Sequence, residues 1–158
     1  MYRKVEDFVQ EWEAASAGTI SAIEAITNDK LGQSIVEGHN SLGWLAWHLV
    51  SVGGAFGQSA GFDVKAPAPG RQAPNDVSEI AEAYKKLSNG IIEGAAKLSD
   101  GDMLEEVNSV FGNIPRGKLL RILIDHQTHH RGQMTVLIRQ AGLNVPGVMG
   151  PTKEMQQN

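Results

Sequence analysis

The sequence contains no cysteine among its 158 residues. This absence excludes a disulfide framework, a thiolate nucleophile supplied by the protein and any zinc site with cysteine ligands. A metal ion bound by this chain must therefore be held by histidine, aspartate or glutamate side chains, or by water.

An excess of positive charge is also lacking. Lysine and arginine total 14 against 18 aspartate and glutamate residues, so the formal net charge is −4 with neutral histidines. Nucleic-acid-binding domains concentrate lysine and arginine to neutralise phosphates, and this chain has no long basic run. We therefore expect no nucleic-acid partner.

Long apolar runs are missing as well. The most apolar stretch, residues 42–52, is interrupted by His48 and is much shorter than the ~20 residues that a membrane-spanning helix needs. Residues 1–7 hold no apolar core of a signal peptide. We expect a cytoplasmic protein with no membrane partner, and the length predicts one domain over residues 1–158.

Four segments carry apolar residues at the three- and four-residue spacing of an amphipathic helix. They cover about residues 2–27, 41–60, 76–98 and 115–141. Asn40 or Ser41 is expected to cap the second helix. Four helices of similar length predict an all-α four-helix bundle over about residues 2–142, followed by a C-terminal tail over 143–158.

Two of the segments between helices have a distinctive composition. Residues 61–75 contain three prolines and two glycines, which predicts a loop, and its position is compatible with a lid or rim over the site. Residues 103–115 alternate in polarity around the turn pair Gly112-Asn113, which indicates a short strand or an extended connection. The second helix is also unusual, because its glycines at positions 43, 53, 54 and 57 each cost roughly 1 kcal/mol relative to alanine. Tertiary packing must therefore hold this helix, and the small residues permit close approach of another backbone.

The histidines are the most informative residues. Five occur, at positions 39, 48, 126, 129 and 130. On a regular helix His126 and His130 lie one turn apart and roughly 40° apart around the axis. Two imidazoles with this spacing can bind one metal ion.

A helical wheel places this pair within the apolar stripe of the last helix. Residues within roughly 60° of its direction are Leu119, Ile122, Leu123, Gln133 and Leu137. The arginines at positions 121, 131 and 139 fall on the opposite side, where solvent is expected. His129 lies at the edge of the inward stripe and is expected to be a neighbour of the site or a surface residue.

The second helix carries a third inward histidine. His48 shares its face with Trp44, Leu45 and Val52. With His126 and His130 it would form a three-histidine metal site with at least one open coordination position, as in reactive sites. Two alternatives remain, because a lone inward histidine is more often a hydrogen-bonded core residue, and the pair could satisfy each other or a water. The three together favour a metal.

The residues of these two helices resemble a known family. The segment from His126 to Gln133 has the pattern His-x-x-x-His-Arg-Gly-Gln, which resembles the signature of the DinB-like (DinB/YfiT) superfamily. Trp-Leu-Ala-Trp-His-Leu at residues 44–49 is similar to the second-helix histidine motif of that family, and Val-Pro-Gly at residues 145–147 is placed as in many members. The resemblance extends from the first helix to about residue 149.

The resemblance implies a four-helix bundle with a divalent metal ion, usually zinc or nickel, held by His48, His126 and His130. It also implies a homodimer and an activity that involves a low-molecular-weight thiol, as in thiol S-transferases and thiol-dependent isomerases. Fold-level similarity leaves the reaction open.

Other residues near the pair receive separate interpretations. Gln133 is expected to bond a ligand or an imidazole from the outer shell, and Gln133, His129 and Trp44 are expected to lie beside the metal or line the substrate site. Arg131 is expected at the surface or in a subunit contact. Gly132 is interpreted as permitting close helix packing, and Asp125 points too far from the pair to bind the metal.

These observations predict a metal-dependent enzyme that transfers a thiol sulfur to a small electrophilic molecule. No aspartate or glutamate is clearly placed as a general base, which favours thiol chemistry over hydrolysis by metal-bound hydroxide. Two alternatives from other classes are a metal- or ligand-binding stress protein without turnover and a purely structural bundle whose histidines bond one another.

Overall fold

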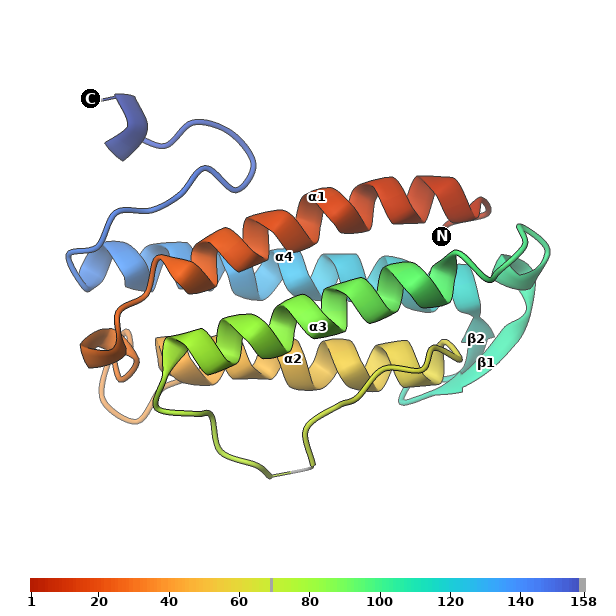
Figure 1. The fold of residues 1–158 in the computed structure, drawn as a ribbon, viewed down its shortest axis with the longest axis horizontal. Helices are drawn as coiled ribbons and strands as arrows, with labels where there is room; N and C mark the ends of the chain where they lie inside the picture. Colours follow the sequence, from red (N-terminus) through yellow and green to blue (C-terminus); the bar gives the residue numbers. More distant parts are fainter. Residues whose placement is uncertain (69, 157–158) are drawn as a thin grey trace.

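The computed structural model describes residues 1–68 and 70–156. Its main elements are four helices, as predicted: α1 (Val5–Glu24), α2 (Leu42–Ser59), α3 (Val77–Ala95) and α4 (Arg116–Gln140). Helices α1 and α2 each pack against both α3 and α4, so the four helices form a bundle around one apolar core (Figure 1). None of the helices in the described residues is long and apolar enough to cross a membrane.

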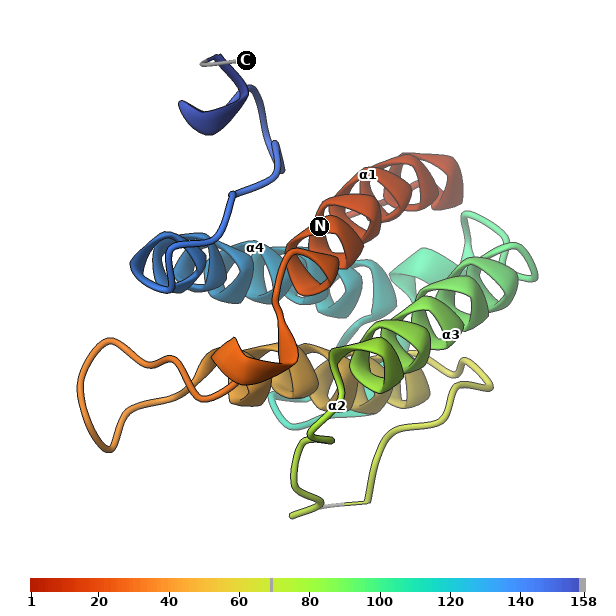
Figure 2. The same cartoon turned by 60° about the vertical axis from the view of Figure 1, so that its left-hand side comes forward.

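The direction of the helices explains the long connection in the middle of the chain. Figure 1 shows α2 and α3 running in the same direction, with α1 and α4 running the opposite way. Because parallel neighbours leave the end of one helix far from the start of the next, the chain must return along the bundle between α2 and α3. Residues 61–68 and 70–75 lie along this return, which we call the return segment, and Figure 2 shows them beneath α2 and α3.

Side-chain caps begin two of the helices, and the cap of α2 was predicted. The Ser41 hydroxyl accepts a hydrogen bond from the backbone N–H of Trp44 at 3.2 Å, and a carboxylate oxygen of Asp76 accepts one from the N–H of Ser78 at 2.9 Å. These side chains satisfy N–H groups that have no partner within the first turn. Ser41 rather than Asn40 is therefore the cap of α2.

The ambiguous segment before the last helix forms a β-hairpin. Strands β1 (Glu106–Ser109) and β2 (Gly112–Pro115) pair antiparallel, with Val107 opposite Ile114. Three short 3-10 helices complete the chain: η1 (Asn28–Lys30), η2 (Asp102–Leu104) and η3 (Glu154–Gln156), the last of them in the C-terminal tail.

The glycines of α2 serve close packing, as predicted. A Cβ atom at Gly54 would lie 2.7 Å from the Cα of Ala66, and one at Gly57 would lie 2.6 Å from a methyl carbon of Val64. The return segment therefore packs directly on the backbone of α2, and a larger side chain at either glycine would push the segment away.

Candidate metal centre

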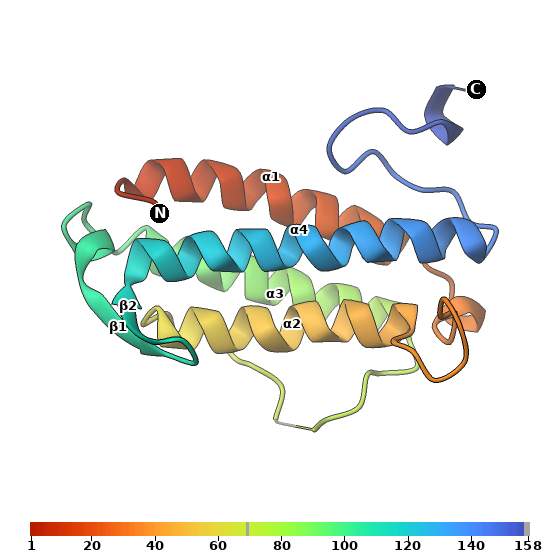
Figure 3. The ribbon, with the colours of Figure 1, turned by 180° about the vertical axis from the view of Figure 1, so that it is seen from behind.

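Three histidines meet between α2 and α4, the two helices that lie side by side in Figure 3. His48 comes from α2, and His126 and His130 come from successive turns of α4. One ring nitrogen of each lies within 4.8 Å of the others, and all three residues are partly buried. The ring centroids of His126 and His130 are 4.5 Å apart, and that of His48 lies 5.0 Å from the first and 4.7 Å from the second. The structure thus brings the three predicted ligands together, and this histidine cluster could hold a metal ion.

The distances within the histidine cluster fit a metal ion. His48 Nε2 and His126 Nε2 are 3.2 Å apart. Two nitrogens that each bind a tetrahedral zinc ion at 2.0–2.1 Å lie about 3.3–3.4 Å from one another. The same distance also suits a hydrogen bond between the two rings.

One nitrogen of His126 has no hydrogen-bond partner within the cluster. His126 Nδ1 is buried and has no hydrogen-bond partner among the described residues. A hydrogen bond to His48 therefore leaves half of this imidazole unsatisfied. Buried polar atoms are nearly always paired, and an exception calls for an explanation such as a functional site. A metal ion bound through His126 Nε2 would leave the same atom without a partner, so Nδ1 does not separate the two interpretations.

Burial keeps two imidazoles of the histidine cluster in the neutral form. Burial is the largest cause that lowers the pKa of His126, and the nearby His130, His48 and His129 contribute in that order, so that the pKa is about 4. Burial also lowers the pKa of His48, with His130 as the second cause. Neutral imidazoles present the lone pairs that a metal ion needs, so these two ligands are ready to bind at neutral pH.

Gln133 forms hydrogen bonds with two histidines on the outer side of the histidine cluster. Its Oε1 lies 2.9 Å from His130 Nδ1, and its Nε2 lies 3.1 Å from His129 Nε2. With the amide oxygen accepting from the Nδ1–H of His130, the Nε2 lone pair of that histidine is left for a metal. Outer partners of this kind fix the tautomer and orientation of metal-binding histidines. His129 itself is exposed and contacts the cluster through Gln133 and the edge of His130.

Trp44 lies at the solvent side of the histidine cluster. Its ring stacks on that of His48 with centroids 4.5 Å apart and planes 13° from parallel. The tryptophan is nevertheless 42% exposed. Trp44 therefore packs against one face of the His48 imidazole, and the exposed part of its own ring is accessible to a molecule in solvent.

Two residues that the sequence reasoning missed connect the helices behind the cluster. Gln127 and Tyr84 are fully buried, and the Tyr84 hydroxyl donates a hydrogen bond to Gln127 Oε1 at 2.8 Å. Gln127 Nε2 donates to the backbone oxygen of Leu49 at 3.4 Å. Gln127 follows His126 and Leu49 follows His48, so these bonds join α2, α3 and α4 at the level of the cluster. The position of Gln127 directly after His126 was the signal for this role in the sequence.

The prediction that Arg131 faces solvent is wrong. Arg131 is only 4% exposed, and its Nη1 donates hydrogen bonds to the Ala15 oxygen at 2.7 Å and the Thr19 hydroxyl at 3.3 Å. The reason is that α4 packs against α1 as well as α2, so two of its faces are buried. Burial also lowers the pKa of the guanidinium group.

Gly132 and Asp125 lie near the histidines in the sequence but outside the histidine cluster. Gly132 is exposed, and a Cβ atom there would meet nothing within 4 Å, so this glycine does not serve helix packing within the chain. Asp125 is exposed and forms an ion pair with Arg121 at 2.6 Å, and it is not part of the histidine cluster.

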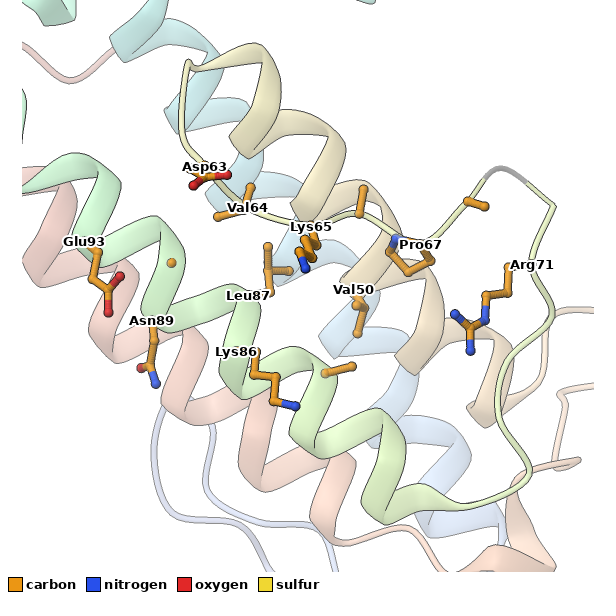
Figure 4. Close-up of a pocket in the computed structure, with 14 residues that line it drawn as sticks. Val50, Asp63, Val64, Lys65, Pro67, Arg71, Lys86, Leu87, Asn89 and Glu93 are labelled. Atoms are coloured by element: carbon orange, nitrogen blue, oxygen red, sulfur yellow. The ribbon is translucent and has the colours of Figure 1, made fainter.

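The return segment lies away from the histidine cluster. Its described residues form one wall of a groove of about 630 Å³ whose other wall is α3 (Figure 4). Asp63 and Glu93 lie toward one end of the groove, with Arg71 at the other and Lys86 between them (Figure 4). The segment is therefore the rim of a separate groove, and the interpretation of it as a lid or rim of the histidine site is not supported.

The comparisons with known proteins identify the family of the chain and support its helical fold. The chain matches the model of the DinB family over residues 1–158. The Bacillus subtilis (strain 168) protein YrdA, described as uncharacterized, is 37% identical over 155 residues, which are 98% of this chain and 93% of that protein. The crystal structure of a DinB-like protein from Bacillus cereus ATCC 10987 has a TM-score of 0.84 at 36% identity, and covers 93% of this chain and 99% of that chain.

A second solved structure extends the likeness of fold. A DinB-like protein from Bacillus subtilis has a TM-score of 0.72 at 18% identity, and covers 92% of this chain and 99% of that chain. The fold and the cluster define a helical-bundle protein with a three-histidine candidate metal site. The chain belongs to the DinB family.

Proposed function

We propose that His48, His126 and His130 bind one divalent metal ion and that the protein uses it to transfer a thiol sulfur to a small electrophilic molecule. The observation that carries the metal site is the convergence of three imidazole nitrogens within 4.8 Å. The 3.2 Å separation of His48 Nε2 and His126 Nε2 supports it further, because it suits two imidazoles that bind one tetrahedral ion.

The chemistry of the donor set suits a reactive site. Three histidine ligands leave a coordination position open, whereas structural zinc sites fill all four. A divalent ion held there would lower the pKa of a thiol or water bound at the open position, so that an anionic nucleophile forms near neutral pH. Zinc and nickel are the ions proposed, since both accept imidazole ligands.

The transfer step requires two reactants, the thiol and the electrophilic molecule. The sulfur of the thiol forms a bond to an electrophilic carbon, and the bond from that carbon to its leaving group breaks. The leaving group departs with the electron pair, and the thiol proton passes to solvent. The chain needs no cysteine for this step, because the sulfur comes from a low-molecular-weight thiol.

The lack of a carboxylate in the histidine cluster favours thiol transfer over hydrolysis. No aspartate or glutamate among the described residues joins the three histidines in the cluster. Hydrolysis commonly requires a general base to activate or orient water, whereas a thiol that has lost its proton needs none. Gln133 bonds His130 and Trp44 stacks on His48, and we propose that these two side chains orient the substrate. We also propose that the protein is a homodimer.

Elemental analysis is the first test of the metal site. Protein purified without added metal or a histidine tag should contain about one equivalent of a divalent ion per chain. The double variant His126→Ala/His130→Ala should contain none, while His39→Ala, which changes an exposed histidine outside the cluster, should retain the ion. No metal in the wild type after incubation with zinc, nickel and manganese would show that the histidines are core residues.

The reaction class needs a second test. Metal-loaded protein should conjugate at least one common cellular thiol to a member of a panel of electrophiles, and the double variant should not. Absence of conjugation with every thiol, despite bound metal, would contradict the enzymatic proposal and favour a metal- or ligand-binding stress protein. Hydrolysis of the same electrophiles without thiol would favour the metal-dependent hydrolase.

A further inference from the structure

A small pocket adjoins the histidine cluster on its outer side. It encloses about 310 Å³ between the segment before α2 and the surface of α4. Leu45 and Leu137 are buried at its base, and Ile35 and Val136 form more exposed walls. Gln133 completes it toward the cluster. We refer to this cavity as the apolar pocket.

The lining of the apolar pocket specifies the kind of group it can accept. No charged side chain of the described residues lines it, and its base and walls are aliphatic. A charged group placed there would lose hydration without gaining an oppositely charged partner, which is costly. A cavity of roughly 150 Å³ lined by aliphatic side chains holds one benzene molecule. The apolar pocket therefore suits a neutral group of about one ring with a short substituent.

Gln133 connects the apolar pocket to the histidine cluster. The same side chain lines the pocket and bonds His130 Nδ1 at 2.9 Å. Leu45 also precedes His48 by three residues in α2, so the two side chains lie on neighbouring parts of one helix face. A molecule that fills the pocket thus contacts Gln133, the residue that bonds the Nδ1 side of His130.

We propose that the apolar pocket binds the electrophilic substrate, which carries a neutral aromatic or short alkyl group, and holds its reactive end toward the histidine cluster. The proposal rests on the proposed function for the identity of the occupant as a substrate. Gln133 is then a positioning residue for both the substrate and His130. His39 and Asn40, which also line the pocket, provide hydrogen-bonding groups for a polar substituent.

The test measures binding to metal-free protein, so it does not depend on catalysis or on the metal. Benzyl alcohol is the neutral probe, with benzoate and benzylammonium as charged probes of the same size. Backbone amide chemical shifts should change in a saturable way at Leu45, Val136 and Leu137 with benzyl alcohol. The charged probes should bind about tenfold more weakly, which corresponds to a difference of about 1.4 kcal/mol.

Matched variants locate the binding site. Val136→Lys places a charge on the wall of the apolar pocket, and Val110→Lys makes the same change at a hairpin residue that is 82% exposed. The first should weaken benzyl alcohol binding roughly tenfold and the second less than about twofold. Ile35→Lys, at a residue that is 55% exposed, should repeat the effect of Val136→Lys without changing the core.

The outcomes separate this proposal from the proposed function. Saturable binding that Val136→Lys and Ile35→Lys weaken supports the pocket even if no metal or thiol transfer is found. Shifts that are absent, or equal for all three probes and unchanged in both variants, would overturn the proposal. Conversion of a dimer to a monomer by Val136→Lys, with no probe binding to either, would assign the surface to a second copy of the chain and also overturn it.

Discussion

Replacement of Tyr84 by phenylalanine tests the hydrogen bonds that hold the histidine-bearing helices together. The Tyr84 hydroxyl donates to Gln127 Oε1 at 2.8 Å, and both side chains are fully buried. Gln127 in turn donates to the Leu49 oxygen on α2. The substitution removes one oxygen atom and keeps the aromatic ring, so any loss of stability comes mainly from the polar contact.

The expected loss follows from what the hydroxyl leaves behind. Gln127 Oε1 would remain buried without this donor, and an unsatisfied buried acceptor costs about 1–3 kcal/mol. For a chain of this size, each kcal/mol lowers Tm by roughly 2–4 °C. A loss near 2 kcal/mol would therefore lower Tm by roughly 4–8 °C.

Urea unfolding of the metal-free protein, followed by far-ultraviolet circular dichroism, measures the effect. The midpoint should fall while the m-value stays constant, because the surface exposed on unfolding is unchanged. Tyr2→Phe is the matched control. Its hydroxyl bonds Glu11, which is exposed, so the carboxylate regains water and the loss should be less than about 1 kcal/mol.

The double variant Tyr84→Phe/Gln127→Leu completes the comparison. Because both partners of the bond are removed, its loss of stability should be smaller than the sum of the two single losses, with a coupling of about 0.5–3 kcal/mol. A loss below about 0.5 kcal/mol for Tyr84→Phe, or one equal to that of Tyr2→Phe, would refute the reasoning.

Three other outcomes are expected. Gly54→Ala should lose roughly 1–3 kcal/mol of stability, because the new Cβ would lie 2.7 Å from the Cα of Ala66. Gly132→Ala, in open space on a helix, should gain up to about 1 kcal/mol, and urea titration of the two variants should show opposite signs. The metal-free protein should lose stability as the pH falls from about 6.5 to about 4, because the unfolded chain protonates an imidazole that stays neutral at position 126, whose pKa burial lowers to about 4. His126→Gln should reduce this slope in a pH series, and an unchanged slope would contradict the assignment. Zinc at a hundred times its dissociation constant should raise the free energy of unfolding by about 2.7 kcal/mol, measured by thermal unfolding, and the same zinc concentration should leave His130→Ala unshifted.

Much of the fold follows from local patterns. The spacing of apolar residues predicts all four helices, and the starts of α2 and α3 lie next to side chains that accept N–H bonds. The loop at residues 61–75 is predicted by its prolines and glycines. What these patterns could not show is that α2 and α3 run parallel, because helix direction depends on which faces meet in the bundle.

Some residues around the site can likewise be placed from local patterns, whereas others depend on tertiary contacts. The four-residue spacing of His126 and His130 places them on one helix face by geometry alone, and the family motif points to His48. Arg131 shows the limit of the helical wheel, which assigns one inward stripe to each helix. A charged side chain is expected to face solvent, and only a partner on another helix, here the Ala15 oxygen 116 residues away in the sequence, makes its burial possible.

The sequence by itself determined what the protein cannot use and which residues are candidates. It excludes cysteine ligands, contains no long basic run and places histidines where imidazoles on one helix face can meet. Only the tertiary structure decided that His48 approaches His126 to 3.2 Å, that Gln127 joins the helices behind them and that an apolar pocket lies beside Gln133. The reason is physical: helical periodicity is local, whereas burial and hydrogen-bond partners are set by segments that meet after the chain has folded.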